Sequence, residues 1–299
     1  MFKSAVIFNE IFLKHDLPSH PENATRLHAF LKTLPSFNIP ILDSKPVDMH
    51  LLKLAHDENY IHEVEKRCQS FEGHLDPDTY YNEHSYYAAL MAAGAVEKAV
   101  NLCFKENFNC VLCAVRPPGH HAEHGRAMGF CIFNNVVAGT LKALELGFKK
   151  VFIIDFDAHH GNGTQHILSN NPDVFYFSSH RYPFYPGTGS ESENNEHTYN
   201  IPLSAEAGDV EIKQIYGEIL PGLINKFQPE ILLVSAGFDL HKDDYLAGMK
   251  VTDEGVRFIL ETLVSIAREK TLPIIFTLEG GYNLQVLERS GEILFKLIS

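Results

Sequence analysis

Residues 155–163, Asp-Phe-Asp-Ala-His-His-Gly-Asn-Gly, carry side chains whose types and spacing suit a metal ion. They follow an apolar run, residues 151–154, which predicts a strand buried on both faces. Alternate side chains of an extended chain share a side, so Asp155, Asp157 and His159 should project the same way. A carboxylate and an imidazole two residues apart can bind one metal ion. Aspartates at strand ends are also frequent helix caps and turn formers, so this stretch alone leaves both interpretations open.

Other segments also place polar side chains after a predicted strand. His120 and His121 follow the predicted strand 110–115. Asp239 ends the segment 231–239, and Tyr282 ends the segment 274–282. Because parallel strands end at one edge of a sheet, these side chains could converge with those of residues 155–163. Two carboxylates and one imidazole would leave a divalent metal with open coordination positions, as in catalytic sites. Such a metal polarises a carbonyl group and acidifies a bound water molecule.

The elements that must position these residues alternate between strand and helix. Further strands are predicted at residues 3–8 and 174–178, and helices at 22–34, 51–68, 85–104, 212–227 and 253–270, with one more that follows residues 129–135 and ends at residue 146. Two segments are predicted to be exposed loops, residues 73–82 and residues 180–195. The chain has no linker, repeat or break in composition, which favours a single doubly wound α/β domain over residues 1–299.

Length and composition allow one large α/β domain or two smaller ones, because 299 residues can bury a full core in either case. A hydrophobic content of 45% and a charged content of 21% are ordinary for a globular protein and argue against disorder. The formal net charge of −13 argues against direct binding to nucleic-acid phosphates and is compatible with amine-bearing substrates. Six of the 17 histidines lie at 120–124 and 159–166, and this clustering indicates function.

The five cysteines predict free thiols in a reducing compartment, because their number is odd and Cys110, Cys113 and Cys131 lie in apolar segments. The Cys-x-x-Cys spacing of the first two could bind zinc or do redox chemistry. It lies within a predicted strand and has no second pair, so core packing is the favoured interpretation. The chain shows neither a leader with a cleavage site nor a run of about 18 apolar residues, which predicts a cytoplasmic protein without a membrane segment.

With these residues in view, the chain resembles the zinc-dependent histone deacetylase superfamily, which includes acetylpolyamine amidohydrolases and acetoin-utilisation proteins. The resemblance covers nearly the whole chain and rests on an ordered set of motifs: His20-Pro21-Glu22 with Arg26, residues 116–122, Gly129-Phe130, and residues 155–164, 185–189, 236–239 and 278–282. The Arg-Pro-Pro-Gly-His-His sequence of residues 116–121 and the asparagine at position 162 are similar to those of the class II and bacterial branch. The resemblance implies the arginase/deacetylase fold, an eight-stranded parallel sheet with helices on both faces.

The resemblance also implies a catalytic machinery. Asp157, His159 and Asp239 would bind Zn²⁺, with Fe²⁺ as an alternative. His121 would be the general base and acid, and Tyr282 would donate a hydrogen bond to the oxyanion.

Two further pairings are implied by the same resemblance. His120 would face Asp155 and carry a raised pKa, because a nearby negative charge favours the imidazolium. His121 would face the neutral Asn162 and remain uncharged, as a base must. Four other histidines have no corresponding role, and a surface or structural role is favoured for each: His124, His166, His197 and His241.

A structural potassium ion is implied beneath the zinc. Its ligands would come from Asp155, Asp157 and His159 together with Ser178 and Ser179. The substrate tunnel is implied to involve wall residues Gly129, Phe130 and Tyr185, the rim residue Asp78, the gatekeeper Leu246 and, at an inner acetate pocket, Arg26.

The implied reaction removes acetyl or other acyl groups from lysine side chains in proteins or peptides and releases acetate. The alternative is an acetylpolyamine amidohydrolase, which typically has a dimerisation loop and an acidic residue at the mouth. The short chain and Leu246 favour lysine, although Asp243 and Asp244 lie close by. A binding module without catalysis would need a broken ligand or tyrosine, and arginase-like chemistry would need a second acidic ligand set; the sequence shows neither. The oligomeric state stays open.

Overall fold

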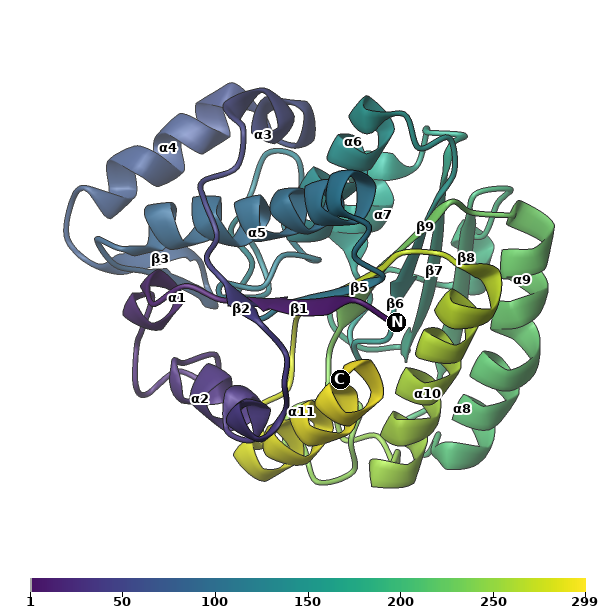
Figure 1. Cartoon of the computed structure of the whole chain (residues 1–299). Coiled ribbons are helices and arrows are strands. Elements are labelled where there is room, and N and C mark those ends of the chain that lie inside the picture. Colours follow the sequence, from purple (N-terminus) through teal and green to yellow (C-terminus); the bar gives the residue numbers. More distant parts are fainter. Residues whose placement is uncertain (1) are drawn as a thin grey trace.

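The computed structural model describes residues 2–299, and its centre is an eight-stranded sheet with helices on both faces (Figure 1). The strand order is β2-β1-β5-β10-β9-β6-β7-β8, and every pairing is parallel. The strands are β1 (Ser4–Ile7), β2 (Ile41–Leu42), β5 (Cys110–Cys113), β6 (Val151–Asp155), β7 (Val174–Arg181), β8 (Thr198–Leu203), β9 (Ile231–Ala236) and β10 (Ile274–Leu278). The predicted single-domain, doubly wound α/β fold is confirmed.

Helices form the two outer layers (Figure 1). One layer contains α3 (Met49–Ala55), α4 (Glu58–Cys68), α5 (Ser85–Glu106), α6 (Asn135–Leu146) and α7 (Asn162–Leu168). The other contains α2 (Thr25–Leu31), α8 (Asp209–Gln214), α9 (Leu220–Phe227), α10 (Asp253–Lys270) and α11 (Leu284–Ile298), with a π-helical stretch, Ile215–Ile219, joining α8 to α9. The short α1 (Ile11–Lys14) and 3-10 turns at Leu34–Ser36 and Glu191–Glu193 complete the helical elements. No helix within residues 2–299 is long and apolar enough to cross a membrane.

The central strands are buried along their whole length, because helices cover both faces of the sheet. Strand β6 therefore carries only apolar residues until Asp155, its last residue. Since β5, β10, β9 and β6 are neighbours, their carboxyl ends form one row, and polar side chains that follow these strands meet at that edge. All five cysteines are buried and free, which confirms that Cys110 and Cys113 are packing residues of β5.

The predicted helix over residues 51–68 is wrong in one respect: it is two helices, α3 and α4. Asp57 has an extended conformation between them, and its side chain accepts hydrogen bonds from the main-chain N–H groups of Asn59 and Tyr60. This side-chain cap starts a new helix and therefore interrupts the predicted one. The apolar periodicity continues across the break, so it could not reveal the interruption.

The predicted loop over residues 73–82 is instead a β-hairpin of β3 (Gly73–Asp76) and β4 (Thr79–Tyr81). Asp76 accepts hydrogen bonds from the N–H groups of Asp78 and Thr79, which forms the turn that its Asp-rich sequence favours. Tyr80 is buried, so the aromatic residues of this segment pack inward. The hairpin thereby holds Asp78 in a defined position.

Three smaller corrections concern element limits. The helix predicted at 22–34 covers only α2, because Glu22 is buried beneath it in a polar cluster described below. The strand predicted at 174–178 continues to Arg181 and shortens the predicted loop 180–195. Strand β8 was not predicted, since its sequence Thr-Tyr-Asn-Ile-Pro-Leu lacks a continuous apolar run.

Gly94 of α5 tests how closely this helix packs against the segment that contains Lys45. A Cβ on Gly94 would overlap the carbonyl oxygen of Lys45, so Gly94→Ala should destabilise the fold by roughly 1–3 kcal/mol, although alanine favours helices. Gly222→Ala in α9 is the matched control, because no atom lies within 4 Å of its added Cβ, and a gain of up to about 1 kcal/mol is expected. Urea unfolding followed by circular dichroism measures both. Equal stability of the two variants would contradict the packing.

Candidate metal centre and active site

The carboxyl ends of the central strands bring the predicted site residues together. They are His120 and His121 after β5, Asp155, Asp157 and His159 at and after the end of β6, Asp239 after β9, and Tyr282 after β10. Glycines make room for the carboxylates: a Cβ on Gly237 or Gly280 would overlap the side chain of Asp157. The main-chain N–H of Gly280 donates to Asp157 Oδ2 at 2.8 Å and fixes its orientation.

The three predicted metal ligands form one cluster. Asp157, His159 and Asp239 each offer a ligand atom, and these atoms lie within 4.8 Å of one another. The Nδ1 atom of His159 is 2.9 Å from Asp239 Oδ2 and 3.1 Å from Asp157 Oδ1. Both carboxylates are fully buried, with exposed fractions of 1% and 0%. The sequence therefore predicted correctly that the three residues meet.

The electrostatics of this cluster favour a cation. Burial alone would lower the pKa of His159, but Asp239 and Asp157 raise it to about 10. Burial and the charge of Asp157 raise the pKa of Asp239 to about 6. Burial and the charge of Asp157 thus oppose the charge of Asp239, whereas His120 and His159 hold the pKa of Asp157 below its usual value; a cation at the cluster would relieve the cost at Asp239. One imidazole nitrogen and two carboxylate oxygens are a donor set that fits Zn²⁺.

Two adjacent histidines beside this cluster have pKa values that are shifted in opposite directions. Nδ1 of His120 lies 3.0 Å from Asp155 Oδ2, whereas Nδ1 of His121 lies 2.8 Å from Asn162 Oδ1, as the sequence predicted. Burial opposes charge on His120, yet Asp155 and Asp157 raise its pKa to about 10. Burial, together with the positive charges of His120 and His159, holds the pKa of His121 well below its usual value.

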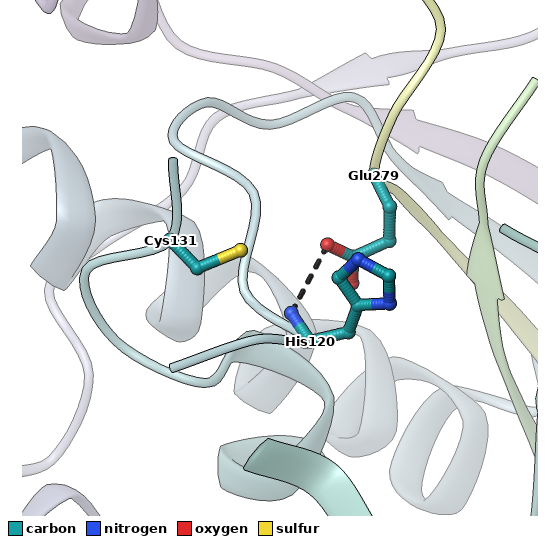
Figure 2. Close-up of side chains that lie close together, drawn as sticks. All are labelled: His120, Cys131 and Glu279. Carbon is teal, nitrogen blue, oxygen red and sulfur yellow. Dashed lines mark hydrogen bonds between the residues drawn. The ribbon is translucent and has the colours of Figure 1, made fainter. Parts of the chain in front are cut away.

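Glu279 is a buried carboxylate to which the sequence analysis assigned no role. Its Oε2 accepts hydrogen bonds from the N–H groups of Gly119 at 2.7 Å and His120 at 3.2 Å, and Ser235 donates to its Oε1 at 3.1 Å. Figure 2 shows Glu279 beside His120 and Cys131. Potential ligand atoms of these three residues lie within 4.8 Å, but burial raises the pKa of Cys131 well above its usual value. The position of Glu279 in the motif 278–282 was visible in the sequence; its contacts were not.

A narrow cavity of about 140 Å³ leads to the cluster. Its lining contains Asp78, His121, Gly129, Phe130, His159, Phe184, Tyr185, Leu246 and Tyr282. Phe184 was not predicted; its ring stacks on His159 with centroids 5.2 Å apart. The only sequence signal for it is its place in a proline-rich aromatic loop beside Tyr185. A larger surface groove of about 520 Å³ beside α5 is lined mainly by charged side chains and contains none of the site residues.

Asp78 lines this cavity, and its Oδ1 accepts a hydrogen bond from the N–H of Gly129 at 3.1 Å. The β3–β4 hairpin (the rim hairpin) is thus hydrogen-bonded to Gly129 in the wall of the cavity. Tyr282 also lines the cavity, and burial raises the pKa of its phenol well above the usual value. It therefore keeps its proton and can donate a hydrogen bond.

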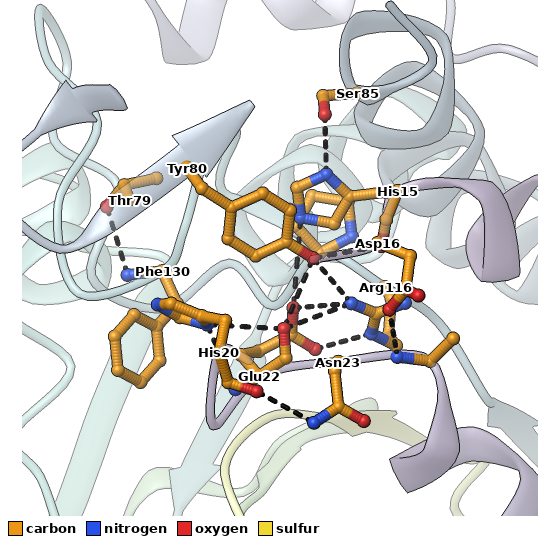
Figure 3. A network of polar contacts seen from close by, with 12 residues as sticks. His15, Asp16, His20, Glu22, Asn23, Thr79, Tyr80, Ser85, Arg116 and Phe130 are labelled. Carbon is orange, nitrogen blue, oxygen red and sulfur yellow. Dashed lines mark hydrogen bonds and ion pairs between the residues drawn. The ribbon is translucent and has the colours of Figure 1, made fainter. Parts of the chain in front are cut away.

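Arg26 lies outside the lining of this cavity, in a buried ion-pair cluster (Figure 3 shows its neighbours). It donates to Glu22 Oε1 at 2.7 Å and to the carbonyl oxygen of Gly281 at 2.6 Å. Arg116 also binds Glu22, through Oε1 at 2.6 Å and Oε2 at 2.9 Å, and donates to the hydroxyl of Tyr80 at 2.7 Å. This cluster ties the rim hairpin, the histidine loop and the turn before Tyr282 to one carboxylate.

The residues predicted to bind potassium are neighbours. Ser178 lies directly across from Asp155 in the β6–β7 pair. Its hydroxyl lies 2.8 Å from His180 Nδ1, and the hydroxyl of Ser179 lies 2.8 Å from that of Tyr216. Potassium binding at this place stays a prediction.

Comparison with known proteins identifies relatives of the whole chain. The histone deacetylase domain family matches residues 20–298. The chain is 35% identical to Histone deacetylase 15 of Arabidopsis thaliana, over 99% of this chain and 56% of that protein, so it spans just over half of that relative. It is 32% identical to a probable deacetylase of Archaeoglobus fulgidus, over 94% of this chain and 82% of that protein. The crystal structure of the HDA15 HD domain superposes with a TM-score of 0.93 at 32% identity, covering 98% of this chain and 90% of that one.

The geometry of the cluster predicts its metal content. Asp157→Ala, His159→Ala or Asp239→Ala should each lose stoichiometric zinc, because two remaining ligands hold the ion weakly. His160→Gln is the matched control, since the ring nitrogens of His160 bond to Thr188 and Gln165 rather than to the cluster. Zinc per chain, measured by mass spectrometry after dialysis, distinguishes them. Full zinc occupancy in any of the alanine variants would remove that residue from the ligand set.

Proposed function

The chain belongs to the histone deacetylase family, and on that premise we propose that it is a zinc-dependent hydrolase that removes acetyl groups from lysine side chains in proteins or peptides. The observation that carries this proposal is the convergence of the Asp157–His159–Asp239 cluster, two differently charged histidines and Tyr282 at the end of one narrow cavity. Amide hydrolysis needs a base, an acid and an oxyanion donor around an activated carbonyl, and these residues provide that set.

A zinc ion bound by Asp157, His159 and Asp239 would polarise the acetyl carbonyl and acidify the attacking water. In our proposal His121, which its surroundings keep neutral, takes the proton from that water and later gives it to the leaving amine. His120 is not the proposed base, because Asp155 and Asp157 raise its pKa to about 10. Its positive charge instead stabilises negative charge that develops beside it.

Tyr282 is the proposed oxyanion donor. It remains protonated because burial raises the pKa of its phenol. Its main-chain N–H donates to Asp244 Oδ2 at 2.6 Å, which helps to fix the turn that carries the side chain. The Arg26 guanidinium lies 5.1 Å from the centroid of the tyrosine ring and supports the same turn from the interior. The proposed place of Arg26 at an inner acetate pocket is a separate prediction.

The cavity favours a lysine substrate over an acetylpolyamine. Phe130, Phe184 and Tyr185 give it apolar walls, which suit the methylene chain of acyl-lysine. Asp244, the acidic residue nearest this turn, is buried and accepts main-chain hydrogen bonds from Tyr282 and Asn283. It is therefore committed to the protein and does not face a substrate ammonium group.

Asp243, the other acidic candidate, is also engaged within the protein, because it pairs with Lys242 at 3.0 Å and with Arg289 at 3.5 Å. The remaining gatekeeper is Leu246, which is apolar and lines the cavity. An acetylpolyamine remains the alternative substrate.

We further propose that residues 1–299 act as one cytoplasmic deacetylase domain with Zn²⁺, or alternatively Fe²⁺, at the catalytic centre. A structural K⁺ would be held at Asp155 and Ser178, supported by their adjacency across β6 and β7. Acetate would be the second product. The net charge of −13 disfavours direct contact with nucleic acid.

Side-by-side turnover decides the substrate class. We expect the zinc-loaded protein to hydrolyse an acetyl-lysine peptide with a kcat/KM at least about tenfold above that for acetylspermidine, since a buried polar group left without a partner costs roughly 1–3 kcal/mol. A longer acyl-lysine peptide is compared in the same assay. Leu246→Glu should shift the preference toward the polyamine by adding an acidic group at the cavity. A wild-type preference for acetylspermidine would favour the alternative function.

Tyr282→Phe tests the proposed mechanism. We expect kcat to fall by on the order of 10²–10³ with zinc content unchanged, because one oxyanion donor is lost. Tyr245→Phe is the control: this tyrosine is exposed and its ring centroid lies 6.5 Å from that of Tyr282. If Tyr282→Phe raised KM and left kcat intact, Tyr282 would be a substrate-binding residue instead.

A further inference from the structure

The side chain that faces the proposed base His121 is an amide, and an amide does not by itself decide which imidazole nitrogen carries the proton. A carboxylate only accepts hydrogen bonds, so it would force the proton onto Nδ1. Asn162 could present either its oxygen or its nitrogen to His121. A base needs a free lone pair on Nε2 and therefore the proton on Nδ1, so some other group must orient the Asn162 amide.

Glu123 is positioned to do this. Its Oε1 lies 2.5 Å from Asn162 Nδ2, and a carboxylate can only accept. The other neighbours of Nδ2 are the sulfur of Met128 at 3.3 Å and the carbonyl oxygen of His121 at 3.4 Å, which are also acceptors. The amide nitrogen must therefore face Glu123, and the amide oxygen must face His121 Nδ1, 2.8 Å away.

Glu123 is itself held from two sides. His166 lies four residues after Asn162 in α7, so both project from one face of that helix. Its Nδ1 lies 2.8 Å from Oε1 and 3.0 Å from Oε2 of Glu123. On the main-chain side, His56 Nε2 accepts from the N–H of Asn134, so its Nδ1 carries the proton that bonds to the Glu123 carbonyl oxygen at 2.9 Å.

The charges agree with this geometry. Burial opposes charge on Glu123, but hydrogen bonds from His166 and Asn162 outweigh it and lower its pKa. The hydrogen bond to Glu123 raises the pKa of His166. The half-exposed His166 thus supplies the positive partner of a carboxylate that is 13% exposed. The sequence favoured a surface or structural role for His166. In the structure its ring bonds to the Glu123 carboxylate, which in turn accepts a hydrogen bond from Asn162.

We propose that Glu123 is a positioning residue that fixes the catalytic tautomer of His121 by orienting the Asn162 amide, with His166 holding Glu123 in place. This inference rests on the proposed role of His121 as the base. This arrangement has the advantage that the carboxylate of Glu123 does not contact His121. It sets the tautomer of His121 through the Asn162 side chain that lies between them. A carboxylate in direct contact would also raise the pKa of His121 and weaken it as a neutral base.

The direct test is the tautomer of His121 in the zinc-loaded protein, measured by ¹⁵N NMR of histidine-labelled samples and assigned by loss of the signal in His121→Gln. We expect the Nδ1–H form in the wild type. Glu123→Lys replaces an acceptor with a donor, so the amide should turn over and the Nε2–H form should dominate. Glu123→Gln should give a mixture of the two forms. Glu193→Gln is the matched control, because Glu193 bonds to Gln165 of the same helix but not to Asn162.

Kinetics provide a second, independent measurement. We expect Glu123→Lys to lower kcat by roughly 10²-fold, the contribution of a general base, with zinc content and KM close to wild type. In an Asn162→Asp background the same change should cost no more than about twofold, since a carboxylate at position 162 accepts from Nδ1 whichever group stands at position 123. This rescue separates positioning from a structural defect, which would lower kcat in both backgrounds.

An Nδ1–H tautomer that persists in Glu123→Lys, with kcat unchanged, would overturn the inference. Equal losses of kcat in the wild-type and Asn162→Asp backgrounds would also overturn it. If the NMR signals change as expected but the wild type hydrolyses no acyl-lysine or acetylpolyamine substrate, the positioning role of Glu123 stands and the proposed function fails.

Discussion

The rest of the structure depends on a concentration of buried negative charge at one edge of the sheet. Asp155, Asp157, Asp239 and Glu279 have exposed fractions of 0–1%, and each ends or follows one of the central strands β6, β9 and β10. Buried carboxylates are costly unless they are paired with cations or hydrogen-bonded. Here the carboxylates are stabilised by His120 and His159, whose pKa values they raise, and by main-chain N–H groups that donate hydrogen bonds to them. The remaining negative charge favours a metal ion at the cluster. The buried negative charges that lower the stability of the fold also favour the binding of a cation at this place.

A second buried cluster keeps this edge in shape. Glu22 is fully buried between Arg26 and Arg116, and these arginines reach the turn before Tyr282 and the hydroxyl of Tyr80 on the rim hairpin. Burial opposes the charge of Glu22, yet the two guanidinium groups lower its pKa to about 2. Removing one partner would leave an uncompensated buried charge, which is far more costly than losing an exposed ion pair. The relative placement of rim, histidine loop and tyrosine turn is therefore fixed by charge pairing and not only by apolar packing.

The sequence predicted the elements whose signals are local and repeated. The apolar runs of β6, β9 and β10 located the sheet edge, and the alternation of Asp155, Asp157 and His159 located two members of the candidate metal cluster. Features set by single capping side chains, such as the break at Asp57, were missed because apolar periodicity continues through them. The contacts of Glu123 and Glu279 were missed for another reason: their partners lie 39 and 160 residues away, at Asn162 and Gly119, and only the folded chain brings these together.

The opposite pKa shifts of His120 and His121 follow from their different partners. His120 and His121 are the central residues of a turn that a hydrogen bond from the Ala122 N–H to the Gly119 carbonyl oxygen closes, and in this turn His120 faces Asp155 at the end of β6 while His121 faces Asn162 at the start of α7. Their ring centroids are only 4.0 Å apart, and two imidazolium ions at that separation would repel strongly. Protonation of His120 by its carboxylate partners therefore itself disfavours a proton on His121. The positive charge of His120 thus helps to keep His121 neutral, and the two histidines differ because they face different partners.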